Sequence, residues 1–349
     1  MIRVWIVTDD KAGNEMPARG LAERVAQRIP CEIAPKRVTP GGVWRRLPPA
    51  MWLLRAARAG GFPFTALPEE QRAALTPPWP DLAIGCGRIA APFVAAIGRL
   101  SPGTATVQIL DPHLPERHFD LIVAPEHDGR TGARVLTVTG SLTRITPESA
   151  AAAAREQAER FAALPRPLVA VLIGGSSKAH RMSAAATDRL IEGLQALQRD
   201  AGAGLAVTLS RRTGAENAAR IRAALTGPAT FVWDGTGPNP YPAMLGAADA
   251  VVATEDSVNM VSEAASAGKP VLVASLEGGS AKLARFHARM RALGLTRPFA
   301  GRLETWTPPP FDETGRAADA VLGILRKKNA GPRGPGKSNR EDSRLGDVR

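Results

Sequence analysis

Short apolar runs alternate with helix-like stretches along almost the whole chain of 349 residues. Near-continuous apolar strands separated by helices are typical of parallel sheets that are covered on both faces. The intervals between the strands carry apolar residues at helical spacing, such as Leu190, Leu194 and Leu197. We predict an α/β protein of two doubly wound, Rossmann-like domains that face a cleft. The predicted strands are residues 2–7, 82–86, 106–110, 121–124, 135–138, 168–173, 205–209, 230–232, 250–253 and 271–274.

The length of the chain suits two domains, each with its own core. An alanine-rich helical stretch ends in the proline-rich segment at residues 164–167, which predicts a connection between the domains. We therefore place an N-terminal domain at residues 1–147, a connecting helix or linker at 148–167 and a C-terminal domain at 168–326. Residues 327–349 are rich in Gly, Pro, Ser, Lys and Arg, and we predict a disordered basic tail there.

Several classes of protein are disfavoured by composition. Cys31 and Cys86 are the only cysteines, which excludes a disulfide framework and a four-thiolate metal site. No cluster of His, Cys and carboxylate residues has metal-ligand spacing, so we expect no bound metal and no cofactor. No apolar stretch approaches the roughly 20 residues of a membrane span, and no leader follows Met1, so we expect a soluble cytoplasmic protein.

The formal net charge is +12, and part of the basic excess lies in the predicted tail. Aromatic residues are scarce, at 5%, and none is interleaved with the basic residues of the tail as a base-stacking surface requires. We therefore expect no nucleic acid partner. An anionic membrane surface or a phosphate-bearing ligand explains the charge as well.

Ligands of doubly wound sheets bind where strands end at their carboxyl edge, and a cleft between two domains is the default site. The first predicted strand of the C-terminal domain ends in a loop that suits a phosphate, because glycine allows close backbone approach. A tight turn capped by serine is the alternative. Two arginines after the next strand suit a phosphate or an acidic acceptor, or they are solvated surface residues. The residues of these two loops are Gly174, Gly175, Ser176, Ser177 and Lys178, and Ser210, Arg211 and Arg212.

A third loop follows the predicted strand at residues 250–253. Asp256 or Ser257 can cap the helix that comes next, and free amides at a helix start favour an anion such as a diphosphate. Glu263 lies about 9 Å along the helix axis from Ser257, which suits a carboxylate that binds a ribose. A well-capped connecting helix with a surface glutamate is the alternative. The candidate binding residues here are Thr254, Asp256, Ser257, Asn259, Met260 and Glu263.

Residues 241–252 and the run Ser-Glu-Ala-Ala-Ser-Ala-Gly-Lys-Pro-Val at 262–271 resemble the donor-binding region of GT-B glycosyltransferases. More closely, residues 1–326 resemble the mitochondrial-fission (elongated-mitochondria) family of plants and bacteria. The pieces that carry this resemblance are Asp9 with Gly13-Asn14, Asp111-Pro112, residues 124–128, 173–178 and 210–213, Asn239-Pro240-Tyr241 and the Glu263 segment. The chain departs from the family at Ser176, where proline is frequent, and in the first loop, which lacks a second Gly and a Gln around Asn14.

The resemblance implies a GT-B-like pair of domains and a pocket of the nucleotide-sugar type. In the GT-B superfamily the helix-borne glutamate contacts the ribose and the preceding loop holds the diphosphate, which here would be Glu263 and the loop before it. The plant relatives of the fission family are described as adaptors that recruit a dynamin-like protein. The resemblance therefore implies the fold more directly than a reaction.

An inverting transferase needs a base in the first domain that removes the proton of the acceptor hydroxyl. Asp9 and Asp111 each follow a predicted strand, and His127 lies beyond a third. We take these three as the candidate catalytic residues. Asp10, His113 and Glu126 also lie at strand ends, and a turn, a cap or a hydrogen-bonded structural role is the alternative for each.

Residues 43–58 combine two tryptophans, several leucines and four arginines. Tryptophan beside arginine in an amphipathic stretch suits the headgroup boundary of a membrane, and a buried helix with a basic outer face is the alternative. The predicted membrane patch is Trp44, Arg45, Arg46, Trp52, Arg55 and Arg58.

The leading hypothesis is a metal-independent, GT-B-like glycosyltransferase-type protein that binds a nucleotide-diphosphate sugar in the cleft. The sugar nucleotide is its expected substrate, and the acceptor is expected at the cytoplasmic face of the inner membrane. A nucleotide-sugar epimerase of the same fold and a non-catalytic adaptor are the alternatives.

Overall fold

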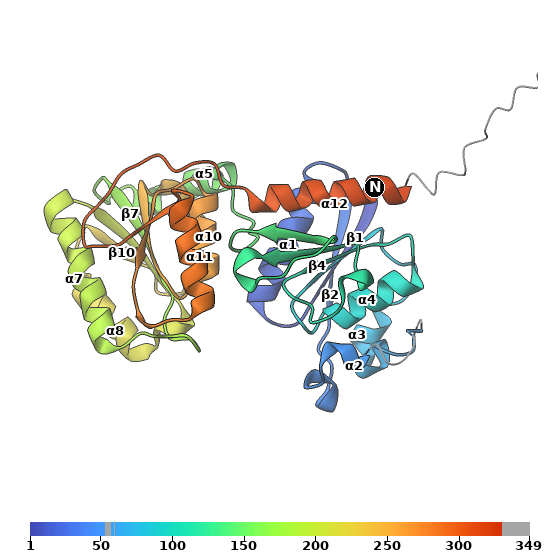
Figure 1. Cartoon of the computed structure of the whole chain (residues 1–349). Helices are drawn as coiled ribbons and strands as arrows, with labels where there is room; N and C mark the ends of the chain where they lie inside the picture. The colour runs from blue at the N-terminus through green and yellow to red at the C-terminus, as the bar shows by residue number, and fades with distance from the viewer. Residues whose placement is uncertain (53–56, 59, 330–349) are drawn as a thin grey trace, which may run out of the picture.

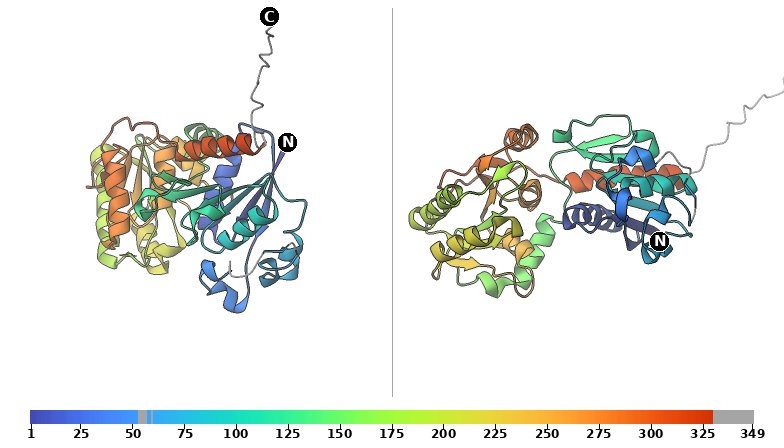
Figure 2. Two further views of the ribbon diagram at one scale, coloured as in Figure 1. Left: turned by 45° about the vertical axis from the view of Figure 1, so that its right-hand side comes forward. Right: turned by 90° about the horizontal axis from the view of Figure 1, so that it is seen from below.

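The computed structural model describes residues 1–52, 57–58 and 60–329. It contains two α/β domains that lie side by side, each built on a twisted six-stranded sheet with helices on both faces (Figures 1 and 2). All strand pairs within the two large sheets are parallel. The predicted fold class, with two doubly wound domains, is confirmed.

The N-terminal sheet has the strand order β2-β1-β3-β4-β5-β6. The register places Val4 of β1 opposite Leu82 of β3. Its elements are β1 (Ile2–Thr8), α1 (Ala12–Ala26), β2 (Cys31–Arg37), η1 (Gly42–Arg45), α2 (Pro49–Trp52), η2 (Phe64–Ala66), α3 (Glu69–Ala73), β3 (Leu82–Cys86), α4 (Ala91–Leu100), β4 (Ala105–Ile109), η3 (Glu116–His118), β5 (Leu121–Pro125), η4 (Glu126–Asp128) and β6 (Val135–Val138).

The second sheet has the order β10-β9-β7-β11-β12-β14, and a separate two-stranded ribbon pairs β13 with β8. The chain reaches it through α5 (Pro147–Glu156) and α6 (Ala158–Phe161). The elements that follow are β7 (Leu168–Ile173), β8 (His180–Arg181), α7 (Ala184–Ala201), β9 (Gly204–Leu209), η5 (Arg211–Thr213), α8 (Ala215–Ala224), β10 (Thr230–Val232), α9 (Tyr241–Ala247), β11 (Ala250–Thr254), α10 (Val258–Ser266), β12 (Val271–Ala274), β13 (Glu277–Gly278), α11 (Ala281–Ala292), β14 (Thr296–Pro298) and α12 (Glu313–Asn329).

Local sequence explains why these elements form where they do. The central strand β7 reads Leu-Val-Ala-Val-Leu-Ile and is buried along its whole length, as a strand covered on both faces must be. Helix α7 begins at Ser183, whose side chain accepts a hydrogen bond from the Ala186 amide, and it ends at Gly202, which has φ +62°. Its leucines at 190, 194 and 197 are buried against the sheet.

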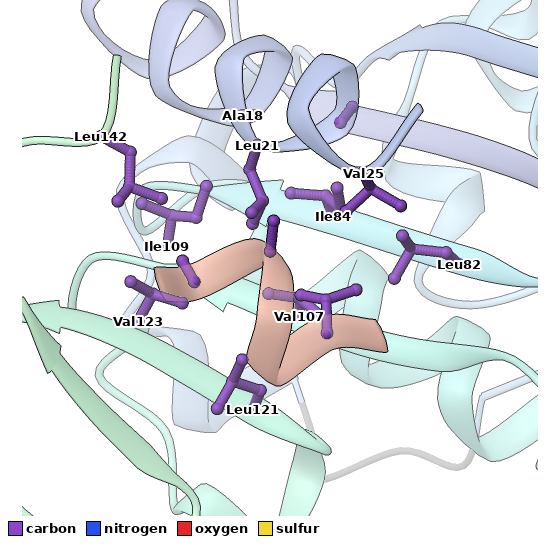
Figure 3. Packing of buried hydrophobic residues seen from close by; sticks show 14 of the residues in the cluster. Ala18, Leu21, Val25, Leu82, Ile84, Val107, Ile109, Leu121, Val123 and Leu142 are labelled. Carbon is purple, nitrogen blue, oxygen red and sulfur yellow. The ribbon is translucent and has the colours of Figure 1, made fainter. Parts of the chain in front are cut away.

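Helix α12 crosses from the C-terminal part of the chain to the N-terminal domain and lies along that domain (Figure 1). Ala317, Val321 and Leu325 of α12 are buried in one core with Leu21 of α1 and Val107 of β4. Figure 3 shows labelled side chains of α1, β3, β4 and β5 gathered around this helix. The assignment of residues 313–326 to the C-terminal domain is therefore wrong, because their apolar face completes the other domain.

The predicted tail also begins too early. Residues 327–329 continue α12, and the Lys328 ammonium donates to the carbonyls of Pro102 and Thr104 and pairs with Asp120 at 2.9 Å. Residues 330–349 lie outside the described part of the chain.

Candidate functional site between the domains

The carboxyl ends of the N-terminal strands open into a cavity of about 560 Å³, which we name the polar cavity. Asp9 after β1, Asp111 after β4 and His127 after β5 all line it. Lys282 and Arg285 of α11 line it from the C-terminal domain. The three candidate catalytic residues are thus brought to one cavity, and five basic and three acidic side chains line it.

The two candidate catalytic aspartates of the polar cavity, Asp9 and Asp111, both have partners in the protein. Asp9 is buried, and its Oδ1 accepts a hydrogen bond of 2.7 Å from Asn14 Nδ2. Asp111 forms an ion pair with Arg130 and accepts from the amide of His113 at 2.9 Å. These partners hold the carboxylates in place and compete for the oxygens that a base would use.

His127 is the third candidate and is also buried. Burial lowers the pKa of His127 below its ordinary value of 6.5, and the positive charges of Lys282 and Arg285 add to this, while Asp128 opposes it. The imidazole lies edge-on to the Phe286 ring, with centroids 5.6 Å apart. A neutral imidazole at neutral pH has a free lone pair, so His127 suits a general base.

Helix α11 supplies basic side chains that the sequence analysis missed. Lys282 pairs with Asp128 at 2.5 Å, and Arg289 pairs with Glu126 at 3.1 Å. Between them, Arg285 donates to the His127 carbonyl at 2.9 Å. The available signal was their spacing of three and four residues, which puts them on one face of the helix. The same spacing is typical of a solvated basic face, so it did not single them out.

The loop after β7 is held by the loop after β11. Thr254 Oγ1 accepts from the Gly174 amide at 2.8 Å and donates to Asp256 Oδ1 at 2.6 Å. Asp256 Oδ2 accepts from the Gly175 amide at 3.1 Å and pairs with Arg212 at 2.5 Å. The Asp256 carboxylate is fully buried, so Thr254 and Asp256 position the glycine loop, and their phosphate-binding role stays a prediction.

The serines around this loop have similar structural partners. Ser210 Oγ donates to the Gly174 carbonyl, Ser176 Oγ accepts from the Met182 amide, and Ser177 Oγ accepts from the His180 amide. Arg211 is exposed and does not line the polar cavity or the two other cavities between the domains that are described below. The three hydroxyls therefore shape the loop in this structure, and their phosphate-binding role stays a prediction.

A second interdomain cavity of about 500 Å³, the loop cavity, lies beside the polar cavity and shares His127 and Lys282 with it. Lys178, Val258 and Asn259 line it from the C-terminal domain. The predicted phosphate-binding residues that face the space between the domains are thus Lys178 and Asn259.

Helix α10 begins at the edge of the loop cavity. Ser257 caps it, and its Oγ accepts from the Met260 amide at 3.3 Å. The Met260 amide is therefore occupied, whereas the amides of Val258 and Asn259 have no hydrogen-bond partner among the described residues. The start of α10 therefore keeps two amide donors without a partner among the described residues, beside the loop cavity that Val258 and Asn259 line.

Glu263 lies one turn beyond Asn259 and is bonded inside its own domain. Tyr241 donates its phenolic proton to Glu263 Oε2 at 2.6 Å. Burial raises the pKa of Glu263 from 4.5 to about 7, and the bond from Tyr241 opposes this. Glu263 lines neither the polar cavity nor the loop cavity. Its ribose-binding role stays a prediction.

Replacing Glu263 with glutamine should remove a pH dependence of stability. Because the folded-state pKa is raised, the native state binds more protons than the unfolded state between pH 4.5 and pH 7, and the free energy of unfolding falls as pH rises through this window. The expected contribution is up to about 3 kcal/mol. Urea denaturation at pH 5 and pH 8 gives the free energy of unfolding of wild type and of Glu263→Gln. If the difference between the two proteins is the same at both pH values, the raised pKa is contradicted.

The predicted membrane patch is not one surface. Trp52 is 3% exposed and packs against Trp44, with ring centroids 5.1 Å apart. Arg45 lines the polar cavity. The tryptophans form an aromatic core with Phe62 and Phe93 because η1 and α2 fold onto α4, which is the alternative that the sequence left open.

The other members of the patch have different positions. Arg46 and Arg58 are exposed, and Arg55 lies outside the described residues. Val43 and Met51 are exposed apolar side chains of the same segment, at 63% and 46%. Among the described residues, no group of three or more His, Cys, Asp or Glu side chains is arranged to hold a metal ion, and no helix is long and apolar enough to cross a membrane.

Comparison with known proteins identifies relatives over most of the chain. A 33% identical relative is the mitochondrial fission protein ELM1 of Arabidopsis thaliana, over 69% of this chain and 63% of that protein, so the match spans less than two thirds of the plant protein. An uncharacterized protein of Rickettsia prowazekii is 24% identical over 78% of this chain and 83% of its own length.

The solved structures show the fold. A UDP-GlcNAc 2-epimerase of Methanocaldococcus jannaschii, in complex with UDP-GlcNAc and UDP, matches 93% of this chain and all of its own chain with a TM-score of 0.51 and 10% identity. The two-domain arrangement is GT-B-like. The sequence profile of the family Mitochondrial fission ELM1 matches residues 12–325, and the chain belongs to this family.

Proposed function

We propose that the protein binds a nucleotide-diphosphate sugar between its two domains and acts as a metal-independent glycosyltransferase. The observation that carries the proposal is the pair of adjoining cavities at the strand ends, one lined by Lys178 and Asn259 and the other by five basic side chains. An excess of basic groups and free helix amides suits a diphosphate. The fold relative from M. jannaschii that holds UDP-GlcNAc and UDP supports the nucleotide-sugar class.

In this proposal the diphosphate lies in the loop cavity, against Lys178 and the amides of Val258 and Asn259. The sugar extends toward His127, which the two cavities share. His127 takes the proton of an acceptor hydroxyl as the bond between the sugar and the diphosphate breaks. Lys178 and the helix amides stabilise the negative charge that develops on the leaving phosphate.

Thermal-shift and calorimetric titrations with UDP, GDP, ADP and CMP sugars test the proposal. A ligand whose concentration is 100 times its dissociation constant should raise the free energy of unfolding by about 2.7 kcal/mol. We expect Lys178→Ala to weaken the affinity for the sugar nucleotide at least about tenfold, since it removes a charge-assisted contact to phosphate. The matched control is Arg181→Ala, an exposed basic residue at the far end of the same loop that lines neither cavity.

Two outcomes lead to the other candidate functions. Conversion of the bound sugar without an acceptor indicates a nucleotide-sugar epimerase, which is the class of enzyme that the M. jannaschii fold relative is named for. The absence of any shift with all four nucleotide classes contradicts the proposal and favours the non-catalytic adaptor, the other alternative from the sequence; the plant relative is named a mitochondrial fission protein.

We also propose that the protein lies at the cytoplasmic face of the inner membrane as a peripheral protein and acts on a lipid acceptor. Val43 and Met51 are exposed apolar side chains, and Arg46 and Arg58 are exposed cations of the same segment. Apolar side chains flanked by cations suit an anionic bilayer surface. Co-sedimentation with vesicles tests this, and we expect more protein in the pellet with anionic lipid than with neutral lipid. An equal amount of protein in the pellet with and without vesicles contradicts the proposal.

A further inference from the structure

A third cavity, the apolar pocket, lies between η4 and β6 on one side and α11 on the other, with a volume of about 450 Å³. Its apolar wall is made by Gly140, Phe286, Ala288 and Ala292. Phe286 is buried, and the two alanines are exposed along α11. None of these four residues belongs to a site that the sequence analysis predicted.

His127 lines the apolar pocket as well as the polar cavity and the loop cavity. It is the residue that all three spaces share. A group bound in the apolar pocket therefore lies against the same imidazole that faces the proposed sugar nucleotide. In a group transfer, the acceptor hydroxyl has to reach both the base and the reacting carbon.

The charged side chains of the apolar pocket already have partners. Arg289 is paired with Glu126, and Arg285 donates to the His127 carbonyl. Hydrocarbon that enters this space gains burial against Phe286 and the alanines without leaving these charges unpaired. The polar cavity is less suited to hydrocarbon, because eight charged side chains line it.

We propose that the apolar pocket binds the hydrocarbon part of the glycosyl acceptor and presents the acceptor hydroxyl to His127. The inference rests on the proposed function and assigns a binding site to the chain of its lipid acceptor, an alcohol carried on a prenyl or acyl chain. In the transfer, the acceptor oxygen forms a bond to the anomeric carbon, its proton passes to His127, and the bond to the diphosphate breaks. The nucleoside diphosphate leaves with the electron pair.

The test uses geraniol, a prenyl alcohol, as the probe, and glycerol as a polar alcohol, with binding to the full chain measured by NMR titration. Ala288→Trp fills the pocket from an exposed helix position. Ala284→Trp makes the same change one turn earlier on α11, where Ala284 is also exposed and lines a different, smaller cavity. We expect wild type and Ala284→Trp to bind geraniol with equal affinity, Ala288→Trp to bind at least tenfold more weakly, and glycerol to bind to none of them.

Geraniol that fails to bind wild type, or that binds Ala288→Trp and wild type equally, overturns the inference. Ala292→Trp fills the pocket from its other exposed alanine and replaces Ala288→Trp if that variant does not fold. UDP-GlcNAc binding is measured on the same samples and should be the same in all of them. If wild type binds none of the four classes of nucleotide sugar, the proposed function is contradicted. If wild type binds a nucleotide sugar but not geraniol, only the acceptor assignment is contradicted.

Discussion

Replacing Gly246 with alanine should lower the free energy of unfolding by about 3 kcal/mol. Gly246 lies in α9, where a Cβ atom would stand 1.9 Å from the Ala150 carbonyl oxygen and 2.9 Å from the Ala154 Cβ of α5. The nearest atom is backbone, so no change of rotamer relieves the clash, and the two helices have to move apart. Denaturant unfolding followed by circular dichroism measures the effect.

The matched control is Gly323→Ala in the middle of α12. This glycine is also helical, and a Cβ atom there would have no atom within 4 Å. Alanine is the better helix former by about 1 kcal/mol, so this variant should be more stable than wild type. Equal effects of the two substitutions would mean that α5 and α9 do not approach each other as closely as the structure shows.

Replacing His127 with glutamine should lower the rate of glycosyl transfer by a factor of about 10² to 10⁴, the range expected for loss of a general base. Affinity for the sugar nucleotide should change little, because Lys178 and the helix amides are unaffected. Single-turnover release of nucleoside diphosphate separates the two quantities. In wild type the rate should fall as pH drops through the pKa of His127, which burial places below 6.5.

His118→Gln is the control, since His118 lies in η3 and lines none of the three interdomain cavities. Asp9→Asn and Asp111→Asn test the other two candidate bases. A retained rate in His127→Gln, together with a loss of 10² or more in one of the aspartate variants, would assign the base to that aspartate.

The sequence predicted the interior of both sheets well. The predicted strands at 82–86, 168–173 and 271–274 coincide with the interior strands β3, β7 and β12. Strand β2 was missed because it is an edge strand that contains Pro35, and its exposed and half-buried side chains do not read as a continuous apolar run. Apolar runs identify strands that are covered on both faces, and β2 lacks this signature, whereas the edge strands β6 and β10 keep enough apolar residues to be predicted.

Periodicity also identifies a buried helix face without saying what buries it. The apolar positions of α12 predict a packed helix. Nothing in their spacing shows whether the helix packs on the C-terminal sheet, which precedes it in the chain, or on the N-terminal sheet, where the structure places it. The same holds for the tryptophans at 44 and 52, which the residue pattern places equally well in a membrane or in a core.

The candidate site could be predicted only in part. Strand ends meet at one edge of a parallel sheet, and this topological rule brought Asp9, Asp111 and His127 to one cavity. The partners of individual side chains are set by distant residues and have no local signal. Asp256 holds a glycine loop 81 residues earlier in the chain, and Tyr241 holds Glu263. Such contacts decide whether a polar group is hydrogen-bonded within the protein or is free to bind a ligand.

The crossing of α12 affects the order in which the protein can fold during synthesis. One face of the sheet that begins with β1 is covered by α1 and α12 together, so part of it stays uncovered until residue 325 has left the ribosome and Ala317, Val321 and Leu325 can pack there. The second domain, translated in between, can bury its own core earlier. The first half of the chain therefore completes its folding last, and a ribosome that stalls before α12 leaves a nascent chain with part of one apolar sheet face exposed to water.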